Sequence, residues 1–148
     1  MSVRKKAYSR RLSALLGAAP KRKQSDLDRW HDRILAGLDF GAVDNVKKHA
    51  ALTDAELARL LGLGEATLRR ARAARTKLDA ATSDRLYRLS KIVAVAEEAL
   101  EGADNAMQWL RRPQPGLAGA VPLELIVTQA GADEVETLLR RIDFGVYT

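Results

Sequence analysis

The sequence of 148 residues predicts an all-α protein. Alanine and leucine are abundant, aromatic residues make up only 5% of the chain and β-branched residues are sparse, a composition that favours helices. Apolar residues also recur at helical spacing in several separate stretches. A hydrophobic fraction of 47% beside a charged fraction of 30% allows both a packed core and a solvated surface.

The first 24 residues contain eight basic side chains and no acidic one. They predict either a flexible arm or a short helix through YSRRLSALLG. Ser13 and Gly17 interrupt the apolar stretch and KRK follows it, so a signal peptide is disfavoured and we expect a cytoplasmic protein. The longest apolar run, residues 92–96, is far too short to cross a membrane.

Two helices are predicted between residues 25 and 51. Ser25 is a suitable N-cap for the first, which ends near Gly37. Its apolar stripe comprises Leu27, Trp30, Ile34, Leu35 and Leu38. The second helix covers residues 41–51, with Val43 and Val46 facing inward.

The stretch TDAELARLLGLGEATLRRARAA predicts a helix-turn-helix. Thr53 followed by Glu56 forms a capping box for the first helix. Gly62 suits the turn because glycine adopts positive φ without strain, and Leu63 can fill the core behind it. A second helix then covers residues 65–75.

The second of these helices carries the candidate DNA contacts. Leu68 and Ala71 face inward, and arginines occupy much of the remaining surface. Arginine can pair with guanine or with phosphate, which suits a helix that enters the major groove. The alternative is that the arginines only solvate an exposed helix. The candidates are Thr67, Arg69, Arg70, Arg72, Arg75 and Lys77.

A long helix follows, capped by Thr82 or Ser83 and extending to about Leu100. Its predicted inward face consists of Leu86, Leu89, Val93, Ala96 and Leu100. Because it spans both halves of the chain, we expect a dimer contact on it. Gly102 ends it, and residues 103–112 form a further helix anchored by Met107, Trp109 and Leu110.

The helical pattern breaks after Trp109. Three of the four prolines fall within ten residues, with glycines between them, which predicts a rigid, kinked loop over residues 113–122. Pro122 suits the first position of a helix. A last helix is predicted to begin near Gly131 and Asp133 and to end at Gly145.

Charge divides the chain. Residues 1–50 carry a net charge of +7, residues 51–90 carry +3 and residues 91–148 carry −4. The basic part suits phosphate, whereas the acidic part is a poor partner for nucleic acid. We therefore divide the chain into a basic arm (1–24), a DNA-binding domain (25–90) and an acidic C-terminal domain (91–148).

Catalytic and cofactor chemistry is not expected. The chain has no cysteine, and His31 and His49 each lack a partner at metal-ligand spacing. The loop between Gly116 and Gly119 lacks the Lys-Ser/Thr that a phosphate-binding loop requires. We predict that the protein is not an enzyme and uses no cofactor or metal.

Three motifs follow the helix-turn-helix segment LARLLGLGEATLRRARAARTKLDAATSDRLYRLSKI: WLRRPQPGLAG, PLELI and GADEVETLLRRIDFGVY. Together they resemble the Xre-type antitoxins with a C-terminal MbcA/ParS-like toxin-binding domain. In that family a Trp-Leu pair, a proline-rich loop, a proline-capped helix and a last helix ending in Ile-acid-x-Gly occur in this order. The resemblance covers about residues 40–148, and residues 1–24 match no part of it. It implies an Xre/Cro-like helix-turn-helix domain followed by a small helical toxin-binding domain.

The resemblance implies an antitoxin of a type II toxin–antitoxin system. Its partner would be a RES-domain toxin, a class that resembles ADP-ribosyltransferases and depletes NAD by cleaving it. The antitoxin would cover the NAD site of the folded toxin. It would also bind double-stranded promoter DNA, as a homodimer, and repress its own operon.

Within the C-terminal domain we interpret Trp109, Leu123, Leu125 and Leu138 as core. An acidic surface suits a toxin pocket that binds an anionic dinucleotide. Three large residues near the chain end either fold back onto the antitoxin or enter the partner, and the behaviour of the family favours the partner. The candidate toxin contacts are Gln114, Gln129, Glu134, Arg140, Arg141, Asp143, Phe144, Val146 and Tyr147. The rival hypothesis is a stand-alone transcription regulator whose C-terminal domain dimerises or binds a small molecule.

Overall fold

The structure is a computed structural model that describes residues 2–17 and 30–145, with side chains from Ser9 onward. Every regular element in this part of the chain is helical, which confirms the predicted all-α class. The first half contains α1 (Ser2–Leu15), α2 (Trp30–Ala36), α3 (Phe40–His49), α4 (Asp54–Leu61) and α5 (Glu65–Ala74). The second half contains α6 (Ala80–Ala99), α7 (Ala103–Arg111), the 3₁₀ turn η1 (Pro115–Leu117), α8 (Pro122–Leu125) and α9 (Gln129–Asp143).

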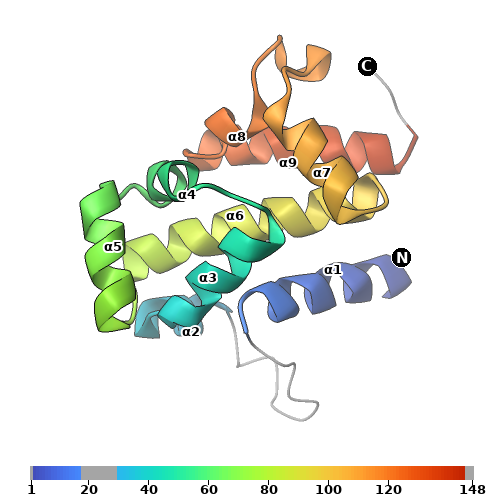
Figure 1. Ribbon diagram of the computed structural model, residues 1–148. Coiled ribbons are helices and arrows are strands. Elements are labelled where there is room, and N and C mark those ends of the chain that lie inside the picture. Colours follow the sequence, from blue (N-terminus) through green and yellow to red (C-terminus); the bar gives the residue numbers. More distant parts are fainter. Residues whose placement is uncertain (1, 18–29, 146–148) are drawn as a thin grey trace.

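Helix α6 runs through the middle of the molecule (Figure 1), and α1, α2, α4, α7 and α9 pack against it. All residues from Ile92 to Glu97 are buried. The middle of α6 is therefore not available for the dimer contact that we expected on this helix. Because helices from both halves of the chain cover α6, one core extends from Leu12 in α1 to Leu139 in α9.

The cap of α6 differs from the prediction. Asp79, not Thr82 or Ser83, is the N-cap, and its carboxylate accepts a 2.7 Å hydrogen bond from the Thr82 backbone N–H. Bonds from the Thr82 side chain and backbone lower the pKa of Asp79. Ser83 is buried, and its hydroxyl instead accepts a 2.9 Å bond from the backbone N–H of Leu38. The predicted cap was wrong because Asp79, three residues before Thr82, already accepts the hydrogen bond of a free backbone N–H in the first turn.

The N-terminal segment forms a helix rather than a flexible arm over residues 2–15. It packs on α3 and α6, and the described part of its inner face, Leu12, Leu15 and Leu16, is buried. The predicted cap Ser25 and the apolar Leu27 lie outside the described residues.

The apolar stripe predicted for the next helix is only partly correct. Trp30 is half-buried against Tyr87, with 5.5 Å between the ring centroids. Leu38 is buried, but it lies beyond the helix end. Leu35 is 61% exposed, contrary to the prediction. Helix α2 has seven described residues, and a helix this short cannot place every residue of the predicted stripe on its buried side.

The helix-turn-helix agrees with its sequence signals. The Thr53 hydroxyl accepts from the Glu56 N–H at 3.1 Å, and the Glu56 carboxylate accepts from the Thr53 N–H at 3.0 Å, so the capping box is confirmed. Gly62 adopts the predicted left-handed conformation, with φ of 69°. Leu68 is completely buried, which fixes α5 against the core.

In the C-terminal half, Pro122 is the first residue of α8, as predicted. Helix α9 begins earlier than predicted, at Gln129, because the Thr128 hydroxyl accepts from the Gly131 N–H at 3.0 Å and caps it. Gly131 serves packing instead, since a Cβ there would collide with the backbone of Leu125. The chain leaves α9 at Gly145, with φ of 74°, as predicted.

Candidate functional sites

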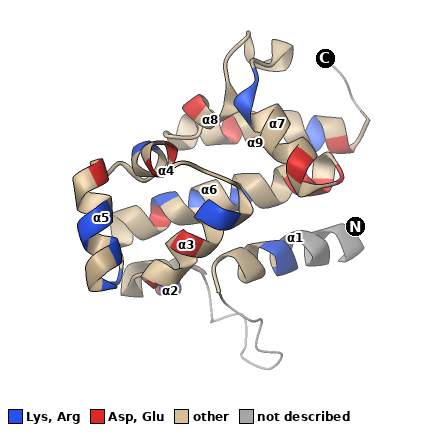
Figure 2. Cartoon of the chain, in the orientation of Figure 1, with Lys and Arg blue, Asp and Glu red and all other residues tan. Residues whose placement is uncertain are grey.

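Helix α5 carries the exposed part of the predicted DNA surface. Thr67, Arg69 and Arg70 are exposed on it, and Figure 2 shows Lys and Arg along this helix. The Arg70 guanidinium donates a 3.3 Å bond to the Thr67 hydroxyl, so these two side chains are held on one face. Lys77 is exposed in the connection to α6.

Two other predicted DNA contacts are engaged within the protein. The Arg72 guanidinium pairs with Asp44 at 3.2 Å and with Asp54 at 3.1 Å, and it lies 5.8 Å from the centre of the Phe40 ring. Arg75, which caps the end of α5, pairs with Asp44 at 3.2 Å. These pairs fix α5 to α3 and α4.

The pKa values of this network follow from its hydrogen bonds. Lys47, first, and Arg72 hold the pKa of Asp54 below its ordinary value, and Asp54 in turn raises the pKa of Arg72. No local sequence pattern indicates this network, because Arg72 is separated from its acidic partners by 18 and 28 residues.

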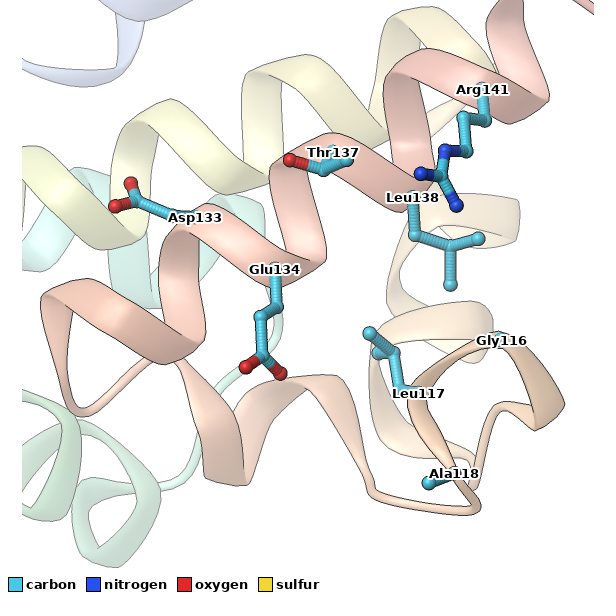
Figure 3. A pocket seen from close by; sticks show the side chains of 8 residues that line it. All are labelled: Gly116, Leu117, Ala118, Asp133, Glu134, Thr137, Leu138 and Arg141. Carbon is cyan, nitrogen blue, oxygen red and sulfur yellow. The ribbon is translucent and has the colours of Figure 1, made fainter.

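A groove of about 470 Å³ lies between η1 and α9 (Figure 3). It contains two of the predicted toxin contacts, Glu134 and Arg141, both exposed. The full lining is Gly116, Leu117, Ala118, Asp133, Glu134, Thr137, Leu138 and Arg141. The sequence analysis missed the loop residues because only the fold places them beside α9.

A close approach of the loop shapes this groove. A Cβ at Gly116 would lie 2.8 Å from a methyl group of Leu138, closer than real side chains approach. The absence of a side chain at Gly116 therefore lets η1 pack directly on α9.

The remaining predicted toxin contacts have varied positions. The Gln114 amide is half-buried and donates to the Trp109 carbonyl at 2.8 Å, which ties the loop to α7. The Gln129 side chain accepts from Arg88 at 3.1 Å and donates to Asp133 at 2.8 Å. These two glutamines stabilise the local structure.

The end of α9 carries the other candidates. Arg140 donates to Glu136 at 3.3 Å, and Asp143 is half-buried. Phe144 is 66% exposed. Val146 and Tyr147 lie outside the described residues.

The two histidines show no metal-site arrangement. His31 is exposed, whereas His49 contacts the buried carboxylate of Glu97, to which Arg11 also donates at 3.1 Å. In the part of the chain that the structure describes, no three His, Cys, Asp or Glu side chains are grouped as metal ligands. None of the helices described there is long and apolar enough for a membrane span.

Both halves of the chain match models of known protein families. Residues 29–91 match the family model of the antitoxin Xre-like helix-turn-helix domain, and residues 95–145 match the antitoxin Xre/MbcA/ParS C-terminal toxin-binding domain. The second match comprises α7, η1, α8 and α9 together with the end of α6.

Two relatives and one solved structure extend these matches. The antitoxin Xre of Pseudomonas putida is 30% identical over 138 residues, which cover 93% of this chain and 84% of that protein. The antitoxin Xre of Yersinia enterocolitica is 28% identical over 118 residues, 79% of this chain and 80% of that protein. A chain in the crystal structure of the M. tuberculosis MbcT–MbcA toxin–antitoxin complex shares the fold, with a TM-score of 0.56 at 22% identity, over 72% of this chain and 94% of that one.

Proposed function

Because the chain belongs to the family of Xre-type antitoxins with an Xre/MbcA/ParS toxin-binding domain, we propose that it neutralises an NAD-degrading RES-domain toxin and represses its own operon. Neutralisation occurs by binding: the C-terminal half covers the NAD site of the toxin. No catalytic group or cofactor of the antitoxin takes part.

The observation that carries the toxin-binding part is the match of residues 95–145 to the toxin-binding domain. This segment contains the groove between η1 and α9, with its exposed charges Glu134 and Arg141. Residues 91–148 have a net charge of −4, which complements a toxin pocket built for an anionic dinucleotide. The match to the MbcT–MbcA complex supports a fold suited to this task.

The exposed face of α5 supports the DNA-binding part. Thr67, Arg69 and Arg70 project from a helix that follows a capped helix and a glycine turn. The internal ion pairs of Arg72 and Arg75 hold this helix in place. We therefore assign base and phosphate contacts to the first three residues and mainly a positioning role to Arg72, whereas Arg75, whose side chain is 68% exposed, stays a candidate DNA contact.

Co-expression with the product of the adjacent gene tests the function. A tagged antitoxin should co-purify with that product, restore growth and prevent the loss of cellular NAD. The purified antitoxin should also shift a fragment carrying the promoter of the operon. A chain that binds the promoter but neither binds the adjacent product nor protects NAD would instead be a stand-alone regulator.

A variant with both Arg69→Ala and Arg70→Ala provides the matched control. It should protect NAD as well as the wild type does while failing to shift the promoter fragment. Loss of both activities would show that the substitutions disturb the fold rather than a DNA contact.

A further inference from the structure

The groove between η1 and α9 has opposite charges at its two ends. Glu134, Leu138 and Arg141 are spaced four and three residues apart, so they share one face of α9. At a rise of about 1.5 Å per residue, Glu134 and Arg141 are roughly 10 Å apart along the helix axis. Figure 3 shows Leu117 and Leu138 between them.

The charged side chains on the two sides of α9 differ in whether they have a partner within the protein. On the side toward α6, Glu136 pairs with Lys91 at 3.4 Å and with Arg140 at 3.3 Å. On the groove side, neither Glu134 nor Arg141 has an ion pair or hydrogen bond with another side chain among the described residues. The helix therefore pairs Glu136 internally on one side; on the groove side Asp133 accepts a hydrogen bond from Gln129, while Glu134 and Arg141 remain available.

The floor between these charges is apolar. Leu138 is only 8% exposed and Leu117 is half-buried. The loop backbone at Gly116 packs against the side chain of Leu138, and this contact joins the loop to the helix beneath the groove. A partner segment with the opposite order of charges and an apolar side chain between them would complement all three features.

We propose that this groove binds one segment of the cognate toxin, which presents a basic side chain to Glu134, an acidic side chain to Arg141 and an apolar side chain to Leu117 and Leu138. The assignment rests on the proposed function. It also specifies an orientation, because the order of the two charges determines in which direction the toxin segment lies along the groove. A toxin with a different charge order meets like charges, so the groove discriminates the cognate partner from related toxins.

Charge-reversal variants test the direction. Glu134→Arg and Arg141→Glu should each weaken binding of the purified adjacent gene product about tenfold or more, measured by calorimetry. The double variant E134R/R141E keeps the net charge but inverts the order, and it should bind no better than either single variant. A matched control, D104R/R59E, reverses two exposed charges outside the groove and should bind like the wild type.

Compensation in the toxin completes the test. Lysines and arginines of the toxin are changed singly to glutamate, and one of these variants should restore binding to the E134R antitoxin. Circular dichroism should remain unchanged in all antitoxin variants, and promoter binding should remain unchanged in the groove variants. Glu134→Gln with Arg141→Gln repeats the test without added charges.

The outcomes separate the two hypotheses. If the wild-type chain binds the toxin and the double variant binds equally well, the groove assignment is wrong while the proposed function stands. If the wild-type chain does not bind the toxin at all, the proposed function is wrong and the groove assignment fails with it.

Discussion

The guanidinium of Arg111, the last residue of α7, donates a 2.9 Å hydrogen bond to the backbone carbonyl of Ala51. Ala51 precedes α4 and has a φ of 51°, in the left-handed region. The same guanidinium lies 3.4 Å from both carboxylate oxygens of Glu56, which also completes the capping box with Thr53. One arginine of the toxin-binding half therefore fixes the turn that leads into the helix-turn-helix.

Replacing this arginine should destabilise the whole protein. Arg111→Ala removes the bond to Ala51 and the pair with Glu56, and we expect a loss of about 1 kcal/mol because both interactions are partly exposed. Urea denaturation measures it. Arg112→Ala changes the neighbouring exposed arginine and should leave the unfolding midpoint unchanged. Equal midpoints for Arg111→Ala and the wild type would contradict a structural role.

The protein should lose stability in acid. Thr82 lowers the pKa of Asp79 below its ordinary 3.8, and Lys47 and Arg72 lower that of Asp54. A carboxyl group with a lowered pKa stabilises the fold fully above its ordinary pKa, and this contribution disappears as pH falls through the folded-state value. Urea midpoints should therefore decrease below about pH 4.

Glu56 contributes to the same acid dependence. Burial raises its pKa, but hydrogen bonds from Thr53 and Arg111 outweigh burial, so the net pKa lies below the ordinary 4.5.

Asp79→Asn provides a control for the acid series, because asparagine caps a helix without titrating. Its midpoint should change less between pH 5 and pH 3 than that of the wild type; an identical change would show that the cap does not contribute.

The arginines of α5 should separate into two classes. Arg69→Ala and Arg70→Ala should each weaken promoter binding, by about 1–3 kcal/mol for a base contact, without lowering the melting temperature. Arg72→Ala should lower the melting temperature and move the pKa of Asp54 back toward 3.8, which an NMR titration of the carboxyl carbon detects. If Arg69 and Arg70 can both be replaced without loss of promoter binding, the DNA surface lies elsewhere.

The contact between Arg11 and Glu97 should stabilise the docking of α1. The Glu97 side chain is 3% exposed, so Arg11→Ala leaves a buried carboxylate with His49 as its remaining side-chain partner among the described residues, at a cost of about 1–3 kcal/mol. In a Glu97→Gln background the same substitution should cost much less. Denaturation of the four proteins in this cycle measures the coupling, and additive effects would exclude it.

Deletion of residues 144–148 should weaken neutralisation while preserving the fold. Phe144 is 66% exposed and contributes nothing to the core, so promoter binding and the melting temperature should be retained. Protection of NAD at matched expression should decrease. Full protection by the shortened chain would assign the covering of the toxin to the 113–122 loop or to α9.

Local signals predicted the local structure well. The Thr53–Glu56 box, Gly62 and the start of α8 at Pro122 each depend on a few adjacent residues, and each is confirmed. The caps Asp79 and Thr128 were missed because several capping residues compete within a few positions of each helix start.

The tertiary arrangement could not be predicted in this way. The Arg72 network and the Arg111 contact join residues far apart in the chain, and sequence periodicity carries no information about such pairs. The change of charge near residue 90 predicted a domain boundary, but it carried no information on the helix α6, which continues across that position. The groove beside α9 likewise depends on how the loop folds back at Gly116.

The continuity of α6 limits how such proteins can be recombined. The helix-turn-helix match ends at residue 91 and the toxin-binding match begins at residue 95. Both positions lie inside α6, the first next to its buried stretch and the second within it. A chimera with its crossover there would pair one parent's central residues with the other parent's covering helices, and cavities or clashes would follow. To exchange DNA specificity between relatives, the crossover should therefore lie in the connection before Ala80 or after Ala99. The residues that cover α6 must be transferred together with α6.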